Sequence, residues 1–146
     1  MDKGEAGRVV VGAKGRLGVS WGQIAEAIGR APAWTVAALL GQHPVPDAEA
    51  KIVAGLLELG EDVEAALRAQ PMRGALESAV PTDPTIYRFY EVLQVYGPAI
   101  KELIHEEFGD GIMSAINFRM DVKRVEDPAG DRVVVTLDGK FLPYQW

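Results

Sequence analysis

The chain has 146 residues, of which 48% are apolar and 25% charged, and its net charge is −6 at neutral pH. It contains no cysteine, which excludes a disulfide framework, a thiolate nucleophile and a cysteine-based metal site. No segment is apolar enough to span a membrane, and the N-terminus lacks the apolar core of a signal peptide, so we expect a cytoplasmic protein.

The first eighty residues predict a bundle of short helices. Ser20–Gly29 begins with a serine that can cap a helix and ends with a glycine that can stop one. Pro32–Leu40 has a proline in its first turn and a glycine after it. Two further helices are expected at Asp47–Leu59 and Glu61–Ala69. The stretch before Ser20 is rich in glycine, so we expect a short or frayed helix there.

Two of these helices, joined by Gly29-Arg30-Ala31, resemble a helix-turn-helix of the repressor type. A DNA-binding regulator with a C-terminal oligomerisation domain is therefore an alternative function. A recognition helix needs Arg, Lys, Asn or Gln at base edges, whereas Pro32–Leu40 offers Thr35 as its one polar side chain. Residues 1–80 also carry eight basic and ten acidic side chains. We therefore expect no nucleic-acid binding, and a structural or subunit-packing role for the bundle.

Residues 71–84 contain three prolines and predict a connector. A helix is expected from Tyr87 to Tyr96, interrupted near Gly97-Pro98 and resumed to about Phe108. Pro98 can either kink one helix or begin a second one at its first turn. Both alternatives are compatible with the sequence.

Beyond Ser114 apolar residues recur at every second position, which predicts a β-strand that includes Ile116–Lys123. A turn is expected at Asp127–Gly130 and a partner strand around Val133–Leu137. A two-stranded hairpin is marginal in water by itself. The hairpin must therefore pack on something else, and another copy of the chain is the natural partner.

A candidate anion site is contained in residues 88–114. Arg88 and Glu91 are three residues apart, so they are neighbours on one face of a helix, and Phe89 and Tyr90 could shelter the arginine from water. Ser114 follows a glycine-rich turn whose backbone N–H groups could help to bind an anion. The simpler alternatives are a solvated surface ion pair and a helix N-cap serine. Spacing alone does not separate them.

Several long strings of this sequence resemble the cyanase (cyanate hydratase, cyanate lyase) family. The resemblance is dense from Pro81 to Pro143 and looser at Thr35–Gln42 and Pro71–Gly74. The matching strings are Pro81-Thr82-Asp83-Pro84-Thr85-Ile86-Tyr87-Arg88-Phe89-Tyr90-Glu91-Val92-Leu93-Gln94-Val95-Tyr96-Gly97, Phe108-Gly109-Asp110-Gly111-Ile112, Ser114-Ala115-Ile116-Asn117-Phe118 and Leu137-Asp138-Gly139-Lys140-Phe141-Leu142-Pro143. Phe141 is a departure, because a tyrosine is common there.

The resemblance implies that Arg88, Glu91 and Ser114 are the catalytic residues. It implies that the substrates are cyanate and bicarbonate, and that the products are ammonia and carbon dioxide, formed by way of carbamate. It further implies that no metal or organic cofactor is needed. It also implies a homo-oligomer, a decamer of five dimers, with sites between subunits. His43 and His105 lack the paired spacing of a zinc motif, and we expect both at the surface.

The predicted fold class is α+β, in two domains. Residues 1–75 form a helical bundle domain that resembles a repressor-type helix-turn-helix domain. Residues 76–146 form a catalytic and dimerisation domain made of a helix plus a β-hairpin. The predicted enzyme is a cyanate hydratase, a carbon–nitrogen lyase.

Overall fold

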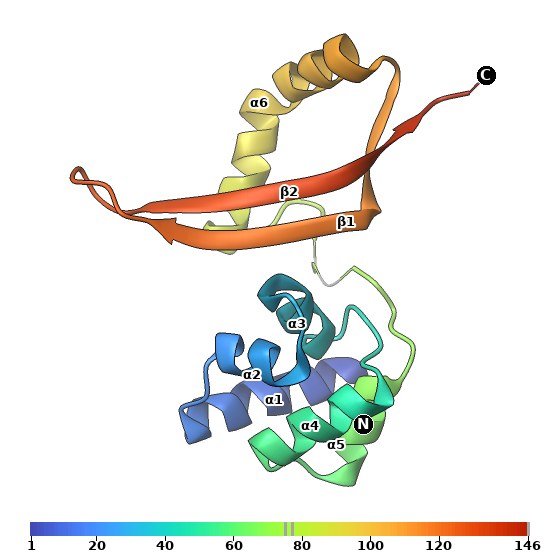
Figure 1. Ribbon diagram of the computed structural model, residues 1–146, viewed down its shortest axis with the longest axis vertical. Coiled ribbons are helices and arrows are strands. Elements are labelled where there is room, and N and C mark those ends of the chain that lie inside the picture. The colour runs from blue at the N-terminus through green and yellow to red at the C-terminus, as the bar shows by residue number, and fades with distance from the viewer. Residues whose placement is uncertain (75, 77, 146) are drawn as a thin grey trace. The chain divides into compact units, whose positions relative to one another are not determined.

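The computed structural model describes residues 1–74, 76 and 78–145, and its architecture is α+β, as predicted (Figure 1). The chain divides into two compact units, one with Met1–Ala75 and Asp121–Val135, the other with Leu76–Met120 and Thr136–Trp146. The predicted domain boundary at residue 75 lies outside the described residues. None of the described helices is long and apolar enough to cross a membrane.

The N-terminal helix α1 (Lys3–Leu17) is regular, so the expectation of a short or frayed helix is wrong. Its start is fixed by a capping box: Asp2 accepts from the Glu5 N–H at 2.7 Å, and Glu5 accepts from the Asp2 N–H at 2.8 Å. Gly7 allows close packing of α1 on the end of α3, because a Cβ there would lie 3.1 Å from the Leu39 carbonyl oxygen, which is a tight contact. Capping and close packing outweigh the low helix propensity of glycine.

Four short helices complete the bundle: α2 (Trp21–Ile28), α3 (Pro32–Leu39), α4 (Asp47–Leu57) and α5 (Glu61–Arg68). Ser20 caps α2 as predicted, and its hydroxyl accepts from the Gln23 N–H at 3.1 Å. Helix α4 ends two residues before the expected end, because Glu58 adopts a left-handed conformation with φ 54°. The four predicted helices are thus present, with small differences at their ends.

The core of the bundle is formed by side chains between Ala6 and Leu67. The largest of these are at most 1% exposed; they are Ile24, Leu39, Leu57 and Leu67. Lys3 joins distant segments, since its Nζ donates to the carbonyl oxygens of His43 at 3.1 Å and Leu67 at 2.6 Å. Burial lowers the pKa of the Lys3 amine. The bundle therefore contains a closed apolar core of its own.

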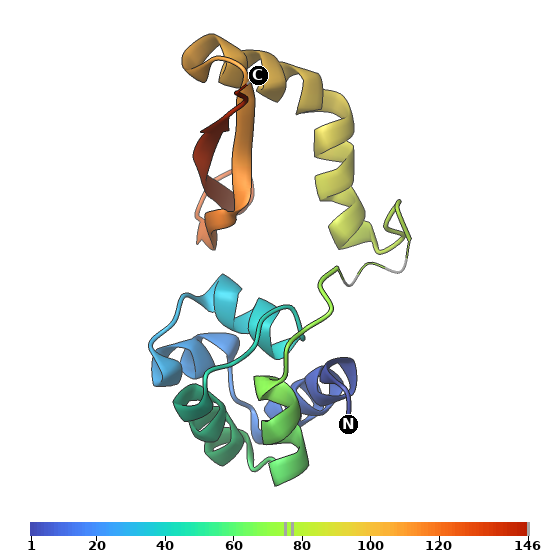
Figure 2. The same ribbon diagram turned by 90° about the vertical axis from the view of Figure 1, so that its right-hand side faces the viewer.

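The C-terminal part begins with α6 (Pro84–Phe108), a helix of 25 residues that contains Pro98. Figure 2 shows that it changes direction along its length, as expected where a proline removes a backbone donor. Of the two alternatives, one kinked helix is therefore the observed one. Asp83 caps it by accepting from the N–H groups of Thr85 and Ile86, each at 2.9 Å. No residue of α6 is buried within the single chain.

The hairpin consists of β1 (Gly111–Val125) and β2 (Arg132–Pro143), paired in a two-stranded sheet. The predicted turn is present, and the Gly130 N–H donates to the Asp127 carbonyl at 2.9 Å. Ser114 lies inside β1, three residues after Gly111, so it follows the glycine-rich bend at Gly109–Gly111 as predicted, and the alternative of a helix N-cap is wrong. Ile116 is 96% exposed and Val133 75%, so a large part of the apolar surface of the hairpin has no partner in the single chain.

Candidate active site

Arg88 and Glu91 lie on the first half of α6 and form the predicted neighbouring pair. Arg88 Nη1 is 3.7 Å from Glu91 Oε2, and the two side chains are 66% and 53% exposed. The Arg88 guanidinium lies 5.8 Å from the centre of the Tyr87 ring. The expected shelter by Phe89 and Tyr90 is not formed within the single chain, where Arg88 is open to solvent and Phe89 is 50% exposed.

An exposed ion pair of this kind adds little to stability. The group in this pair that can bind a small anion is the guanidinium, which is always charged and offers two parallel N–H donors. Glu91 places a carboxylate 3.7 Å from one Nη atom, and the guanidinium keeps N–H donors for a small anion.

Ser114 is held separately from this pair and is 7% exposed. Its Oγ accepts from the backbone N–H groups of Ile116 at 3.1 Å and Asn117 at 2.9 Å. These two N–H groups are thus engaged by the serine. Among the described residues, Ser114 makes no hydrogen bond to Arg88 or Glu91.

Two glycines allow the paired strands to come close beside Ser114. A Cβ on Gly139 of β2 would collide with the Ser114 carbonyl oxygen and the Met113 side chain. A Cβ on Gly111 would collide with the Leu142 carbonyl oxygen and the Phe141 ring. Sequence reasoning quoted Gly139 only as part of a longer string. Its position in the strand-like stretch after Val133 was the available signal, because glycine within a strand marks a close backbone approach.

The end of α6 is fixed to the end of β2 near these glycines. The rings of Phe108 and Phe141 stack with centroids 5.0 Å apart. The Tyr144 N–H donates to the Asp110 carbonyl at 3.0 Å. The strings at 108–112 and 137–143, which are far apart in the sequence, therefore meet in space beside Ser114.

An open cavity of about 340 Å³ lies between the second half of α6 and the start of β1. His105 and Asp110 line it, with His105 Nε2 at 4.0 Å from Asp110 Oδ1. We expected His105 at the surface, but its side chain is 31% exposed and therefore half-buried. Among the described residues, no group of three or more His, Asp or Glu side chains could hold a metal ion.

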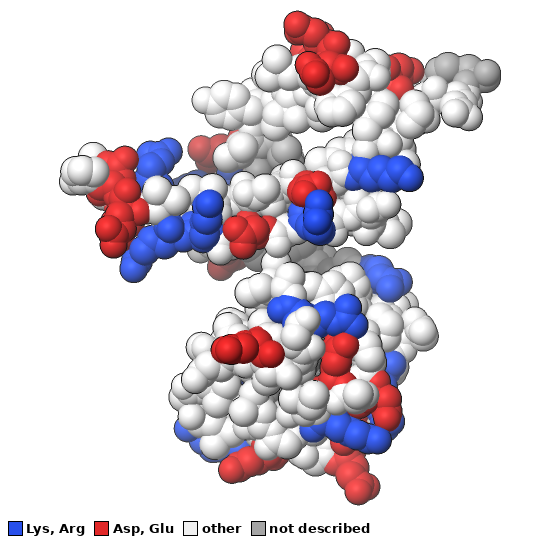
Figure 3. Space-filling view, viewed as in Figure 1, with Lys and Arg blue, Asp and Glu red and all other residues white. Residues whose placement is uncertain are grey.

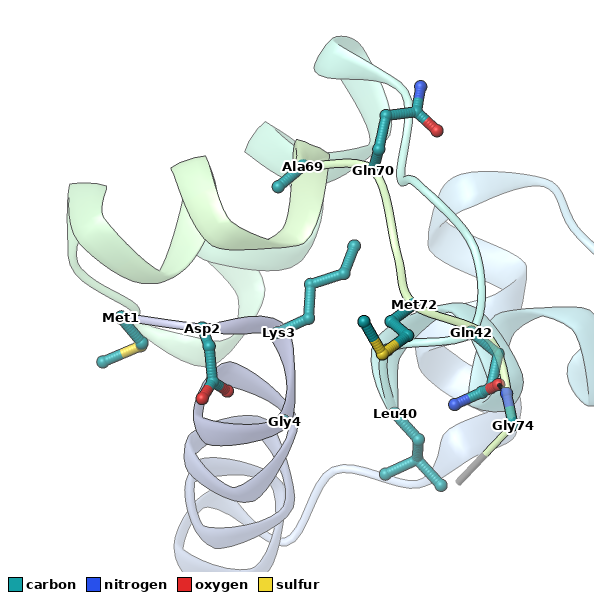
Figure 4. A pocket seen from close by; sticks show the side chains of 11 residues that line it. Met1, Asp2, Lys3, Gly4, Leu40, Gln42, Ala69, Gln70, Met72 and Gly74 are labelled. Atoms are coloured by element: carbon teal, nitrogen blue, oxygen red, sulfur yellow. Dashed lines mark hydrogen bonds between the residues drawn. The ribbon is translucent and has the colours of Figure 1, made fainter. Parts of the chain in front are cut away.

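A second open cavity, of about 470 Å³, lies in the helical bundle (Figure 4). Lys3 reaches across it from the start of α1 toward the segment after α5. The Lys3 amine is engaged with two carbonyl groups, and the Gln42 Oε1 accepts from the Gly74 N–H at 2.8 Å. The Lys3 amine and the Gln42 side chain, which line this cavity, thus link separate segments of the chain.

His43, near this cavity, is half-buried and stacks on Trp34, with ring centroids 5.7 Å apart and an interplanar angle of 9°. Burial lowers the pKa of His43, and the positive charges of Arg73 and Lys3 lower it further. The expectation of a surface histidine is therefore only partly met. Trp34 also packs against the core of the bundle, as expected for a packing residue.

The helix-turn-helix likeness of α2 and α3 does not give a base-reading surface. Thr35, the one polar side chain of α3, is fully buried and donates its hydroxyl to the Ala31 carbonyl at 3.0 Å. On the face seen in Figure 3, Lys and Arg side chains of the bundle alternate with Asp and Glu side chains. Neither feature favours binding to a polyanion.

An exposed guanidinium–carboxylate pair, a buried serine and an α+β framework are compatible with an enzyme that acts on small anions. Residues 78–146 match the family model described as "Cyanate lyase C-terminal domain". Residues 5–71 match the model described as "Cyanate hydratase, N-terminal". The chain is therefore a carbon–nitrogen lyase by class, and it belongs to the cyanate hydratase (cyanase) family.

Individual relatives cover the whole chain. It is 64% identical over 146 residues to the cyanate hydratase of Mycolicibacterium vanbaalenii, and the match covers 100% of this chain and 95% of the relative. It is 54% identical over 145 residues to the cyanate hydratase of Thiobacillus denitrificans, with 99% of each chain covered. The crystal structure of cyanase from T. urticae superposes with a TM-score of 0.83 at 36% identity, covering 94% of this chain and 96% of that one. The predicted family and fold class are confirmed.

Proposed function

We propose that this enzyme decomposes cyanate in a reaction that consumes bicarbonate. Cyanate, bicarbonate and one proton give carbon dioxide and carbamate, and carbamate with a second proton gives ammonia and another carbon dioxide. The observation that carries this proposal is the 64% identity, over the full chain, to a relative named cyanate hydratase. Arg88, Glu91 and Ser114 are the proposed catalytic residues, and no metal or organic cofactor takes part.

The barrier to this reaction comes largely from bringing two anions together and ordering them. Arg88 would bind the anions through its two parallel N–H donors and neutralise the dianionic adduct as it forms. Ser114 would donate a hydrogen bond to a substrate oxygen. Glu91, 3.7 Å from Arg88, would orient the guanidinium; a proton-handling role is the alternative for this carboxylate. Attack by bicarbonate removes the need for an activated water.

We further propose that the active form is a cytoplasmic homo-oligomer, a decamer of five dimers, with sites shared between subunits. The absence of any buried residue on the described helix α6 supports an oligomer, as does the exposure of Arg88 in the single chain. In this proposal residues 1–75 are the helical bundle domain, and residues 76–146 are the catalytic and dimerisation domain.

The test is turnover with carbon-13 bicarbonate and unlabelled cyanate, with ammonia and carbon dioxide measured together. Each turnover releases one carbon dioxide from each reactant, so about half of the trapped carbon dioxide should carry the label under the reaction written above. Carbon dioxide must be trapped before it rehydrates. Full ammonia release in bicarbonate-free buffer, or carbon dioxide without label, would show a hydrolase and contradict the proposal.

A further inference from the structure

The hydroxyl of Ser114 has no acceptor capacity left. A serine oxygen has two lone pairs and one proton. Both lone pairs are engaged, by the N–H groups of Ile116 at 3.1 Å and Asn117 at 2.9 Å. Among the described residues, no acceptor takes its proton. The hydroxyl can therefore only donate, and the two N–H groups polarise it toward stronger donation.

These hydrogen bonds lie in the part of β1 between Ser114 and Arg119. Arg119 Nη2 of β1 bonds Asp138 Oδ2 of β2 at 2.9 Å, whereas Ser114 lies against Gly139. From Arg119 back to Ser114 the chain covers five residues, whereas from Asp138 to Gly139 it covers one. Figure 1 shows β1 turning sharply while β2 continues nearly straight. β1 thus has more residues than β2 between these two contacts, and Ser114 Oγ satisfies two of the N–H groups on that part of β1.

Gly139 lets β1 and β2 come close together at Ser114. A Cβ there would collide with the Ser114 carbonyl oxygen, a backbone atom of the serine itself, and with the flexible Met113 side chain. A methionine can rotate away, but the carbonyl oxygen can move only if the Ser114 backbone moves. Any side chain at position 139 therefore requires a shift of the backbone at Ser114 or at residue 139 itself, and either shift changes how the serine is placed against β2.

We propose that Gly139 is a positioning residue for Ser114, and that it holds the serine hydroxyl as a donor-only group aimed at the substrate anion. This inference rests on the proposed catalytic function of Ser114. It assigns a specific role to a glycine 25 positions further along the chain.

The first test is a double-mutant cycle on kcat/KM for cyanate in the full-length oligomer. Ser114→Ala should lower kcat/KM on the order of 100- to 1000-fold, as for loss of one anion-stabilising donor. Gly139→Ala should lower it on the order of 10-fold or more through the same interaction. The double variant should then be no slower than Ser114→Ala alone. Effects that multiply would mean general structural damage and would overturn the proposal, as would normal activity in either single variant.

Gly12→Ala is the matched control, since no atom lies within 4 Å of a Cβ built there. It should keep wild-type kcat/KM. If Gly139→Ala fails to assemble, Met113→Ala combined with Gly139→Ala removes the side-chain part of the collision and leaves the carbonyl part. This combination should assemble and stay slow; recovery of full activity would show that only Met113 was crowded, and would overturn the positioning role.

A second measurement does not depend on activity. Amide hydrogen exchange at Ile116 and Asn117 reports their bonds to Ser114 Oγ. In Gly139→Ala both amides should exchange at least about tenfold faster, while amides near the Asp127–Gly130 turn keep their rates. Unchanged protection would overturn the proposal. A wild-type enzyme inert toward cyanate would refute the proposed function instead, and the exchange result would still decide whether Gly139 positions Ser114.

Discussion

The two halves of this chain differ in where their apolar residues go. Helices α1–α5 surround a core in which Ile24, Leu39 and Leu57 are completely buried. Helix α6 and the hairpin are also rich in large apolar side chains, but α6 buries none of its residues. Val95 and Leu103 of α6 are each 65% exposed. The first half is therefore complete as a single chain, and the second is composed for an environment that one chain does not supply.

The catalytic candidates lie in the incomplete half. Exposed large apolar side chains that gather on one surface are typical of a contact with another molecule. Arg88 is 66% exposed in the single chain, and Ser114 makes no hydrogen bond to Arg88 within the described residues. Matched substitutions in the two halves can therefore test whether α6 and the hairpin need a partner subunit while the bundle does not.

The largest effect is expected from a charge placed on α6. Leu103→Asp should dissociate the oligomer and abolish cyanate turnover, because the carboxylate would have to be desolvated at a subunit contact. Ile52→Asp is the matched control on the bundle, where the side chain is 43% exposed; it should leave mass and activity unchanged. Light scattering together with an ammonia assay measures both. An active monomer would show that α6 needs no partner.

Arg88→Lys should lower kcat/KM on the order of 100-fold or more while the oligomer stays intact. Lysine keeps the positive charge but loses the two parallel donors. Arg16→Lys is the matched control, since Arg16 is an exposed arginine 4.0 Å from Glu58 in the bundle. Near-normal activity in an assembled Arg88→Lys enzyme would remove Arg88 as the principal anion ligand.

Truncation should distinguish the two halves by the concentration dependence of stability. Leu57→Ala removes a fully buried side chain of the bundle and should cost about 2–5 kcal/mol at any protein concentration. Leu93→Ala, at a residue 58% exposed on α6, should destabilise only through assembly, so its cost should shrink as concentration rises. Denaturant unfolding at several concentrations measures this. A Leu93→Ala cost that is independent of concentration would contradict the contrast.

The smallest effect is expected at Asp47 at the start of α4. Hydrogen bonds from Lys51 and then Arg68 lower the pKa of this carboxyl below its ordinary value of 3.8. A lowered pKa stabilises the fold above the ordinary value, and this contribution disappears as the pH falls through the folded value. Asp47→Asn should lower the Tm by on the order of a few °C at pH 7 and not at all at about pH 2. Glu26 makes no ion pair among the described residues, so Glu26→Gln should leave the Tm unchanged both at pH 7 and at about pH 2.

The features that the sequence predicted correctly depend on local spacing. Ser20 caps α2, and Arg88 and Glu91 are neighbours, because both follow from residues three apart on a helix. The geometry of Ser114 depends on Gly139, 25 residues away, and no local pattern indicates which residues two strands bring together. The shelter expected for Arg88 failed for a related reason: adjacent aromatic residues on a helix do not all face the same side.

The exposed apolar side chains of α6, such as Val95 and Leu103, which we call the α6 face, also have a consequence for folding. Residues 1–68 leave the ribosome first and can fold in a unimolecular step, because all their core contacts are local to that segment. Burial of the α6 face must wait for a second molecule, so the later refolding phase should be second order and slow down on dilution. During that interval the side chains of Val95 and Leu103 are open to unrelated chains. Aggregation during overexpression should therefore begin from this helix and not from the bundle.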